Sequence, residues 1–253
     1  MYELRGRTAL ITGASSGLGA RFAQLLAQGG ARVIVGARRT DRLAQLVERI
    51  SADGGEAFAV ELDVANEASV IAAYDAAEKH FGVVDTIIAN AGTSADGAAI
   101  DVGVEALDHL MAVNVRGVFL TVREGARRLI SSGSKETGRG RIMIVSSITA
   151  QSVEPGLSLY SASKSAVLQM GKVLARDWAN KGINVNVLCP GYIETDINAD
   201  WFASDGGKRQ VDRWPRRRLM EAGALDSILL YLSSDESQYT TGSVFTVDDG
   251  QTL

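Results

Sequence analysis

The chain contains very little cysteine, histidine and proline, and each shortage excludes something. Its single cysteine, Cys189, permits no disulfide within the chain. Because Cys189 lies in an apolar run, we expect it to be a small buried side chain. Two histidines, His80 and His109, do not make a metal cluster with one cysteine, and their polar surroundings predict surface positions. Three prolines, with no repeat or low-complexity segment, give no sign of a linker between domains.

Signals for membranes and nucleic acids are also missing. The first seven residues are polar, unlike a signal peptide, and no run of about 18 apolar residues is present to span a bilayer. The net charge of −4 leaves no dominant basic face for a nucleic acid. We therefore expect a soluble cytoplasmic protein whose partner is a small molecule.

Strand and helix signals alternate along all 253 residues, of which 46% are hydrophobic. The predicted strands lie at 8–12, 32–37, 56–62, 84–89, 141–146, 184–189 and 243–247. Helical patterns lie between them at 20–28, 41–52, 67–80, 104–130, 157–180 and 222–233. This alternation predicts one α/β domain over 1–253, a Rossmann-type doubly wound parallel sheet of about seven strands with helices on both faces.

Two stretches do not follow this alternation. Residues 131–140 are polar and contain glycine, so a solvated loop is predicted there. Residues 196–215 have weak periodicity and follow the sixth predicted strand. Ligands bind outside the carboxyl ends of the strands in open α/β sheets, so a segment at about 192–218 is the natural place for a mobile cover over the substrate.

A glycine-rich turn, Gly13-Ala14-Ser15-Ser16-Gly17-Leu18-Gly19, follows the first predicted strand and precedes a helical pattern. The order strand, glycine turn, helix is the context in which a dinucleotide-binding motif is credible. Glycines let the backbone approach a pyrophosphate, and the start of a helix offers free N–H groups to it. The spacing is G-x-x-x-G-x-G, and an ordinary glycine-rich turn is the alternative.

Two arginines, Arg38 and Arg39, follow the second predicted strand. An acid near this position would hold the ribose 2′-hydroxyl of NAD, whereas an arginine accommodates the 2′-phosphate of NADP. The acid that is present, Asp41, comes later and could cap the next helix. NADP(H) is therefore the predicted cofactor, with Arg38 as the first phosphate ligand and Arg39 as the second; a solvated pair of charges is the alternative.

Tyr160 and Lys164 are four residues apart in a predicted helix, so their side chains share one face. A nearby ammonium favours a phenolate, and we expect Lys164 to lower the pKa of Tyr160 from about 10. Tyr160 could then exchange a proton with an alcohol or ketone oxygen near neutral pH. By itself the pair is weak evidence, because such spacings also occur on solvated helix faces.

Taken with the other motifs, the pair resembles the short-chain dehydrogenase/reductase family along essentially the whole chain. The resemblance is to the carbonyl reductase or secondary-alcohol dehydrogenase type. Its motifs follow the family's order: the cofactor turn 12–19, Asp63-Val64, Asn90-Ala91-Gly92, Asn114, Ser147, Tyr160 with Lys164, and the proline-glycine turn 190–195. One departure is the sequence Val247-Asp248-Asp249-Gly250, where a second glycine is more usual.

The resemblance implies a catalytic tetrad of Asn114, Ser147, Tyr160 and Lys164. Tyr160 would be the acid and base, while Lys164 would lower its pKa and bond the nicotinamide ribose. Ser147 would hydrogen-bond the substrate oxygen, with Ser146 as the competing candidate, and Asn114 would anchor a water that links Lys164 to solvent. The implied cofactor-binding residues are Gly13, Ser15, Ser16, Gly17, Leu18, Gly19, Arg38, Arg39, Asp63, Val64, Asn90, Ala91, Gly92, Tyr160, Lys164, Pro190, Gly191, Ile193 and Thr195.

The substrate side is implied by the loop between Ser147 and Tyr160 and by the expected cover. The residues predicted to line the pocket are Gln151, Glu154, Leu157, Tyr192, Trp201 and Phe202. The two cover aromatics either face the substrate or only pin the cover to the body. Their apolar character predicts bulky, largely apolar ketones or secondary alcohols.

Other functions stay open at this point. A basic cluster at 213–218 could accept an acyl-carrier or CoA thioester, which would make the protein a 3-oxoacyl thioester reductase; a solvated rim or a subunit contact is the other reading. A different class is a cofactor-binding regulator without catalysis, against which the intact tetrad argues. The resemblance also implies a homotetramer, in which the long helices 104–130 and 157–180 pack against their symmetry mates.

Overall fold

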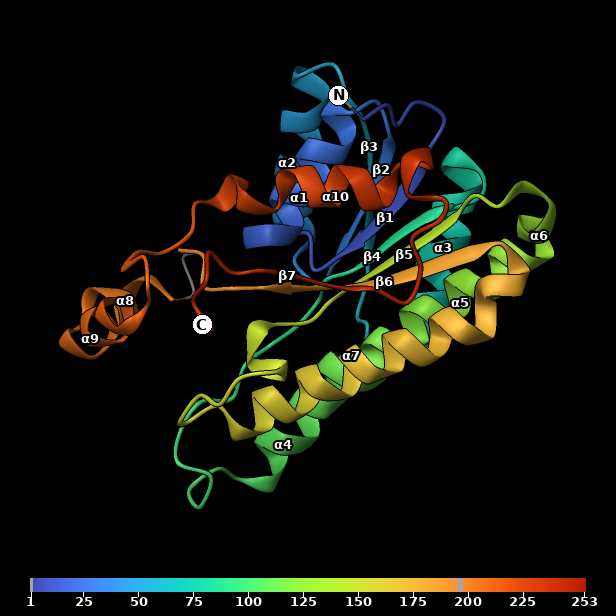
Figure 1. The fold of residues 1–253 in the computed structure, drawn as a ribbon. Helices are drawn as coiled ribbons and strands as arrows, with labels where there is room; N and C mark the ends of the chain where they lie inside the picture. The colour runs from blue at the N-terminus through green and yellow to red at the C-terminus, as the bar shows by residue number, and fades with distance from the viewer. Residues whose placement is uncertain (1, 195–197) are drawn as a thin grey trace.

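Seven parallel strands form one sheet at the centre of the molecule (Figure 1). The computed structural model describes residues 2–194 and 198–253. The strands lie in the order β3-β2-β1-β4-β5-β6-β7. The chain therefore moves outward from β1 on one side and resumes at β4 on the other, which makes the carboxyl ends of β1 and β4 the switch point where such sheets bind ligands. The bounds are β1 Thr8–Thr12, β2 Arg32–Ala37, β3 Glu56–Glu61, β4 Thr86–Ala89, β5 Gly140–Val145, β6 Ile183–Pro190 and β7 Val244–Val247.

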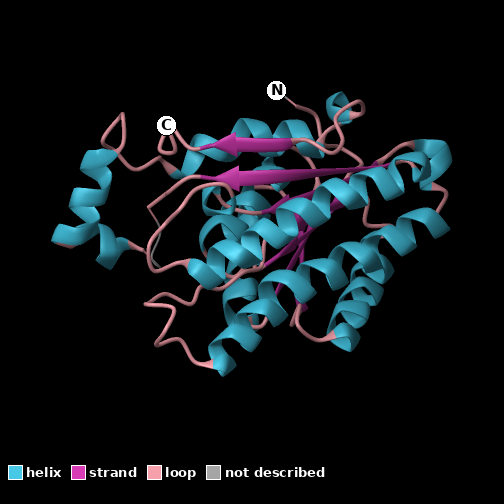
Figure 2. Ribbon diagram, turned by 60° about the horizontal axis from the view of Figure 1, so that its bottom comes forward, coloured by secondary structure: helices cyan, strands magenta, loops and turns pink. Residues whose placement is uncertain are grey.

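Helices cover both faces of this sheet (Figures 1 and 2). The core on one face is built with α1, α2 and α10, and the core on the other with α3, α5 and α7. Their bounds are α1 Gly17–Gln28, α2 Thr40–Ala52, α3 Glu67–Phe81, α5 Val118–Ser131, α7 Ser158–Trp178 and α10 Asp226–Ser233. The shorter elements are α4 Val104–Met111, η1 Ala112–Gly117, α6 Ser134–Thr137, η2 Ile148–Ala150, η3 Ala179–Lys181, α8 Ala199–Ala203, α9 Asp205–Arg213, η4 Ala222–Leu225 and η5 Asp235–Ser237.

The inner strands are buried on both faces, which explains their continuous apolar sequence. All five residues of β1 are buried. Leu10 packs with Ile34 into one core, whereas Ile11 packs with Val35 into the other, as the two-residue period of a strand requires. The predicted fold class and all seven predicted strands are confirmed, with boundaries shifted by up to two residues at β4.

The predicted helix at 104–130 is wrong as a single α-helix. It consists of α4, one π-helical turn η1, and α5. The turn contains Asn114, whose side chain is bonded to Thr93 and Ser163 on neighbouring segments. Gly117 ends the turn against Val64, and an added Cβ there would come within 2.7 Å of the valine side chain. These tertiary contacts fix the local winding, and π-helical turns of this kind are frequent at functional sites.

Two other predictions need correction. The stretch 131–140 is not simply a solvated loop, because it contains α6 and a buried Ser134 whose hydroxyl donates to the carbonyl oxygen of Lys181. The weakly periodic stretch after β6 contains α8 and α9, which project beyond the carboxyl end of the sheet (Figures 1 and 2). Among the described residues, no helix is long and apolar enough to cross a membrane. The cytoplasmic location stays a prediction.

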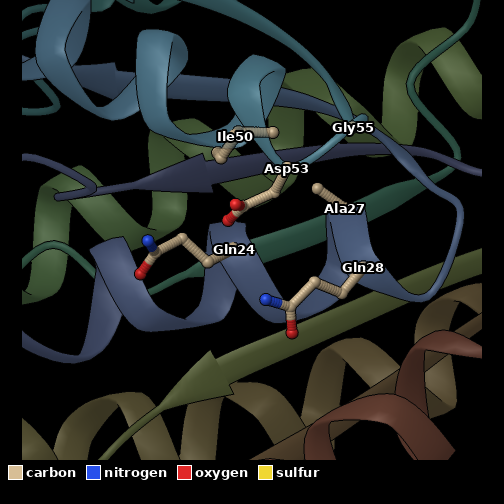
Figure 3. A pocket seen from close by; sticks show the side chains of 6 residues that line it. All are labelled: Gln24, Ala27, Gln28, Ile50, Asp53 and Gly55. Atoms are coloured by element: carbon tan, nitrogen blue, oxygen red, sulfur yellow. The ribbon is translucent and has the colours of Figure 1, made fainter.

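Both histidines are exposed and Cys189 is buried, as the sequence predicted. His80 stacks on Phe58 with ring centres 4.2 Å apart. A small pocket lies between the later turns of α1 and the turn from α2 into β3 (Figure 3). It is distant in the fold from the carboxyl ends of β1 and β4, where the sequence motifs converge. Its lining residues are Gln24, Ala27, Gln28, Ile50, Asp53 and Gly55.

Candidate active site at the carboxyl edge of the sheet

The glycine turn packs closely against the segment that follows β4. Gly13 has a φ of +69°, and a Cβ on it would lie 2.8 Å from the Cα of Ala91. A Cβ on Gly19 would collide with the carbonyl oxygen of Gly13 and with the side chain of Asn90. Glycine is therefore required at both positions, one for its backbone conformation and both for the close approach.

Thr12 and Asn90 join the ends of β1 and β4 at the switch point. The Thr12 hydroxyl accepts hydrogen bonds from the backbone N–H groups of Asn90, at 3.1 Å, and Ala91, at 3.0 Å. The amide of Asn90 in turn donates to the carbonyl oxygen of Thr12 at 3.0 Å. Asn90 and Ala91 thus fix the shape of the turn from beneath, which is a structural role that the sequence motif did not reveal.

The start of α1 is suited to an anion. Gly17 has a φ of +53° and nothing within 4 Å of an added Cβ, so the backbone is open on this side. The N-cap residue Ser16 makes no side-chain cap bond, and the first turn contains no acid. The N–H groups at the helix start and the positive end of its dipole therefore stay available, as a pyrophosphate requires. Ser15, Ser16 and Leu18 lie in this same turn.

Arg39 reaches across the glycine turn. Its guanidinium donates to the hydroxyl of Ser15 at 2.8 Å and to that of Ser16 at 2.8 Å. Arg38 beside it is exposed. Asp41 is not the cap of α2: the N-cap residue is Arg39, and Asp41 lies inside the first turn, where its charge favours the helix dipole.

Asp63 and Val64 follow β3, and both have structural contacts. The Asp63 carboxylate accepts from the backbone N–H of Ala65 at 3.0 Å, and its own N–H donates to the hydroxyl of Ser69. Val64 is buried against Gly117 of the π-helical turn. These bonds hold the loop that follows β3.

Asn114 is completely buried between Thr93 and Ser163. Its amide nitrogen donates to the Thr93 carbonyl oxygen at 2.9 Å and to the Ser163 hydroxyl at 3.0 Å. Its amide oxygen accepts from the Thr93 N–H at 2.8 Å. A Cβ on Gly92 would lie 3.4 Å from both this oxygen and the Lys164 ammonium, so the structure brings Asn114, Gly92 and Lys164 together.

The adjacent serines Ser146 and Ser147 have different environments. Ser146 donates its hydroxyl to the backbone carbonyl of Lys164 at 2.8 Å, which ties the end of β5 to α7. The Ser147 hydroxyl accepts from the N–H and the hydroxyl of Thr149, at 3.2 and 3.1 Å. It also lies close enough to the Tyr160 phenol to lower the pKa of that group. Because neighbouring residues of an extended chain point to opposite sides, only Ser147 faces Tyr160.

The pKa of Tyr160 is raised, so the expectation that Lys164 lowers it is wrong for this structure. Burial of the phenol is the largest cause, and it exceeds the lowering effect of the hydrogen bond from Ser147. The Lys164 ammonium lies 5.6 Å from the centre of the Tyr160 ring and donates to the carbonyl oxygen of Val145 at 3.0 Å. Burial also lowers the pKa of Lys164 to about 8.

The turn after β6 is fixed by the C-terminal residues of the chain. Gly191 donates its N–H to the carbonyl oxygen of Val247 at 2.9 Å, directly after Pro190 ends the strand. Ile193 is buried and bridges to Met220. Thr195 lies outside the described residues. Three of the four predicted residues of this turn therefore stand at the same edge of the sheet as the catalytic candidates.

An aromatic cluster forms the start of the expected cover. Tyr192 stacks on Trp214 with ring centres 5.4 Å apart and meets Phe202 edge-on at 5.5 Å. Phe202 and Trp214 are both buried. Trp201 is 53% exposed, with its indole N–H bonded to Gln210 at 2.8 Å. Phe202 therefore packs the cover against Tyr192, whereas the neighbouring Trp201 is largely exposed to solvent.

The other predicted substrate residues lie on the loop that leads into α7. Leu157 is half-buried at the start of this helix. Gln151 donates to the Thr246 hydroxyl at 3.3 Å. Burial raises the pKa of Glu154, and burial together with the Glu154 carboxylate raises the pKa of Tyr192 to about 12. An acid therefore stands near the tyrosine that begins the expected cover.

Sequence reasoning missed several residues of this region. Trp214 was assigned only to a basic cluster, although its place before Pro215 in a weakly periodic segment could have suggested an anchor. Thr149 orients Ser147. Gln251 binds the backbone of Tyr192 with both ends of its amide, which no motif in the sequence signals.

The fold and the site together define a dinucleotide-binding α/β protein. A family model described as short chain dehydrogenase matches residues 7–206. The chain belongs to the short-chain dehydrogenase/reductase family of oxidoreductases, enzymes that use a nicotinamide cofactor, NAD or NADP, on a small-molecule substrate. The resemblance predicted from the sequence motifs is confirmed at the level of the family.

Similar proteins extend over the whole chain. Glucose 1-dehydrogenase 2 of Bacillus subtilis is 33% identical over 264 residues, which cover 100% of this chain and 98% of that protein. Gluconate 5-dehydrogenase of Gluconobacter oxydans is 32% identical, with 100% and 97% covered. The crystal structure of a short-chain type dehydrogenase/reductase from Mycobacterium marinum superposes with a TM-score of 0.91 at 33% identity, covering 99% of this chain and 97% of that one.

Proposed function

We propose that the protein interconverts ketones and secondary alcohols with NADP(H). The observation that carries this proposal is the approach of the buried Ser147 and Lys164 side chains to the Tyr160 phenol, with the lysine ammonium 5.6 Å from the centre of the ring. A phenol and a hydroxyl that converge on one point can both bond a single substrate oxygen, one as the proton donor or acceptor and one as a fixed dipole.

Each member of the tetrad has a role in this proposal. Tyr160 holds or accepts the proton at the substrate oxygen, and Ser147 hydrogen-bonds the same oxygen as charge develops. Lys164 would hold the ribose of the cofactor. Asn114 would anchor a water beside Lys164, which is consistent with the approach of both side chains to Gly92. A bound nicotinamide cofactor would supply the hydride donor or acceptor.

The proposed preference for NADP(H) rests on Arg38 and Arg39. No acid follows β2 within the turn, and the Arg39 guanidinium bonds Ser15 and Ser16 at the helix start, while Arg38 beside it is exposed. A guanidinium forms forked, charge-assisted hydrogen bonds with phosphate. The remaining cofactor contacts are proposed at Gly13, Gly17, Leu18, Gly19, Asp63, Val64, Asn90, Ala91, Gly92, Pro190, Gly191, Ile193 and Thr195.

We propose that residues 192–218 cover a bulky, largely apolar substrate. The aromatic cluster of Tyr192, Phe202 and Trp214 supports this, because apolar surface provides affinity in such pockets while a few polar groups orient the ligand. The Glu154 carboxyl group lies near Tyr192, and a charge there disfavours a second carboxylate on the substrate. Gln151, Leu157 and Trp201 are the other proposed lining residues.

A 3-oxoacyl thioester reductase is the alternative reaction, and a non-catalytic cofactor-binding regulator is the alternative class. The basic cluster at 213–218 gives only weak support to a 3-oxoacyl thioester reductase. Two of its arginines, Arg216 and Arg218, already pair with Asp249. A non-catalytic regulator has no need of a buried lysine beside a tyrosine and a serine.

We further propose a homotetramer. A groove with an apolar floor runs along α4, η1 and α5, next to α7. Phe119 on α5 is 37% exposed, and Val173 on α7 is also exposed. Apolar side chains gathered on one face favour association with a second copy of the chain. The groove is lined by Asp108, Met111, Ala112, Val115, Arg116, Phe119 and Met170.

The proposed function is tested with a panel of ketones and secondary alcohols. Each compound is incubated with NADPH or NADP⁺, and with NADH or NAD⁺, while absorbance of the reduced nicotinamide is followed. Tyr160→Phe removes only the hydroxyl, so we expect it to lose nearly all turnover while cofactor binding is kept. Turnover within tenfold of the wild type would contradict the assignment, and activity confined to acyl-carrier substrates would favour the thioester reductase.

A further inference from the structure

The C-terminal turn, residues 248–251, contacts both ends of the 192–218 segment. At one end, the Gln251 side chain accepts from the N–H of Tyr192 at 2.7 Å and donates to its carbonyl oxygen at 3.2 Å. At the other end, Asp249 accepts from Nε of Arg218 at 2.7 Å and pairs with Arg216 at 3.3 Å. Two side chains of one short turn therefore hold two points of the chain that are far apart in sequence.

The first of these contacts is tightly packed. A Cβ on Gly191 would come within 2.5 Å of the Gln251 side chain and 2.7 Å of the Cα of Asp248. Gln251 is only 8% exposed. The Asp248 carboxylate accepts from the N–H groups of Gly250 and Thr252, which fixes the conformation of the turn. The turn is thus a firm support from which Asp249 extends.

The backbone at Asp249 is unusual for a residue with a side chain. Its φ is +54°, in the left-handed region that glycine adopts without cost. The family that the sequence motifs resemble more usually has a second glycine in the stretch Val247-Asp248-Asp249-Gly250. Arg217, between the two arginines that bind Asp249, has a φ of +47°. Such conformations persist where the surrounding contacts hold them, and they concentrate at functional sites.

The segment held by Asp249 contains the aromatic cluster. Arg216 and Arg218 follow Trp214 closely, and Met220 bonds back to the carbonyl oxygen of Tyr192 at 3.1 Å. A displacement of the arginines would therefore carry Trp214 away from Tyr192. In contrast, the glycine turn and the tetrad stand on other elements and make no contact with Asp249 among the interactions that the described residues show.

We infer that Asp249 is a positioning residue for the substrate, which acts by holding Arg216 and Arg218 and so keeps the aromatic cluster closed against Tyr192. This inference rests on the proposed function of the 192–218 segment. The arginines are largely exposed, so the attraction is partly screened by salt. Loss of the carboxylate should raise KM for the ketone by about fivefold and change kcat and the KM for the cofactor much less.

The test compares Asp249→Asn and Asp249→Gly with the wild type. Both replacements tolerate the left-handed backbone, so a loss that they share belongs to the carboxylate and not to strain. Asp212→Asn is the matched control, because it removes one negative charge from the exposed surface of α9 in the same basic region. KM for a ketone and for the cofactor is measured at low salt and at about 1 M NaCl, where charges are screened beyond about 3 Å. Limited trypsin digestion provides a readout without turnover, since all the arginines of the segment are retained.

The inference would be supported by a raised ketone KM in both variants at low salt, by a smaller difference from the wild type at high salt, and by faster trypsin cleavage within 208–218. The inference would be overturned if the KM for the ketone were unchanged in either variant. It would also be overturned if Asp212→Asn changed that KM equally, or if trypsin cleavage became faster without a change in KM. If the wild type turns over no ketone or alcohol, the proposed function fails and the digestion alone decides whether Asp249 holds the segment.

Discussion

The ammonium of Lys164 lies 5.6 Å from the centre of the Tyr160 ring while it donates to a backbone carbonyl oxygen of β5. Tyr160 and Lys164, which the sequence places on one face of the helix, are thus neighbours. The hydrogen bond to the carbonyl oxygen of Val145 fixes the lysine side chain against the end of β5. Burial lowers the pKa of Lys164 to about 8 and raises that of Tyr160. Both groups therefore favour their neutral forms more than free side chains do.

The buried Lys164 ammonium should lower the free energy of unfolding at neutral pH, and this cost should disappear as the pH rises and the lysine loses its proton. Its pKa in the folded protein, about 8, is below the value of 10.5 for a free lysine, so the unfolded chain binds more protons between these two values. The wild type should gain stability relative to Lys164→Met as the pH rises from 7 to 10, by roughly 2–3 kcal/mol. Urea unfolding at both pH values measures this change, with the exposed Lys172→Met on the same helix as the control. A difference between wild type and Lys164→Met that does not vary with pH would contradict the prediction.

Ser147→Ala should reduce kcat/KM by about a hundredfold or more, because the removed hydroxyl is a dipole directed at the reacting oxygen. Ser146→Ala should instead lower stability by about 1 kcal/mol, since its hydroxyl bonds the backbone of Lys164, and should leave most activity. Steady-state kinetics and thermal unfolding of the two variants separate these effects. The reverse pattern would show that the assignment is displaced by one residue.

Arg38→Asp should reverse the cofactor preference. A charge-assisted hydrogen bond to the 2′-phosphate is worth about 1.5–3 kcal/mol, so the wild type should favour NADPH over NADH by about ten- to a hundredfold in kcat/KM. An aspartate adds repulsion of the phosphate and can bond a ribose hydroxyl. The exposed Arg42→Asp, on α2, is the control for a general change of charge. Equal efficiency of the wild type with both cofactors would refute the proposal.

Light scattering should give a mass of four times the 26.8 kDa of one chain at micromolar concentration. Phe119→Glu, which adds a charge to the floor of the groove on α5, should shift the mass toward smaller species because a charge at an apolar interface is costly to desolvate. A monomer mass for the wild type would rule the homotetramer out.

Trp201→Ala should raise KM for aryl ketones more than for acetone-sized ones, with kcat less affected. An aromatic side chain that is buried against a ligand contributes on the order of 1–3 kcal/mol. If the indole only braces α8 against α9 through its bond to Gln210, every substrate should lose equally. A wild-type panel in which small carboxylated ketones outperform aryl or cyclic ones would defeat the proposal of an apolar substrate.

Local sequence patterns were sufficient for the sheet. Short β-branched runs such as 8–12 and 32–37 separate cleanly from helical periods, and burial on both faces makes these runs continuous. The glycine turn could also be predicted from the sequence. Gly13 is required by its backbone conformation, and both Gly13 and Gly19 are required by the close approach of the segment after β4. A π-helical turn at Asn114 was not readable, because the contacts that fix it come from Thr93 and Ser163 on other segments.

By itself, the sequence determined the α/β alternation and the residues that carry the candidate chemistry, because these depend on local periodicity and on the chemical nature of single side chains. Only the tertiary structure decided how these side chains are oriented, in which direction their pKa values shift and which distant residues they contact. It turned Ser147 toward Tyr160 and Ser146 away, and it reversed the expected direction of the tyrosine pKa. It also brought Gln251 to Tyr192 across 59 positions of sequence. The desolvation of a group and its long-range partners depend on which elements pack around it, and the spacing of residues along the chain does not encode that packing locally.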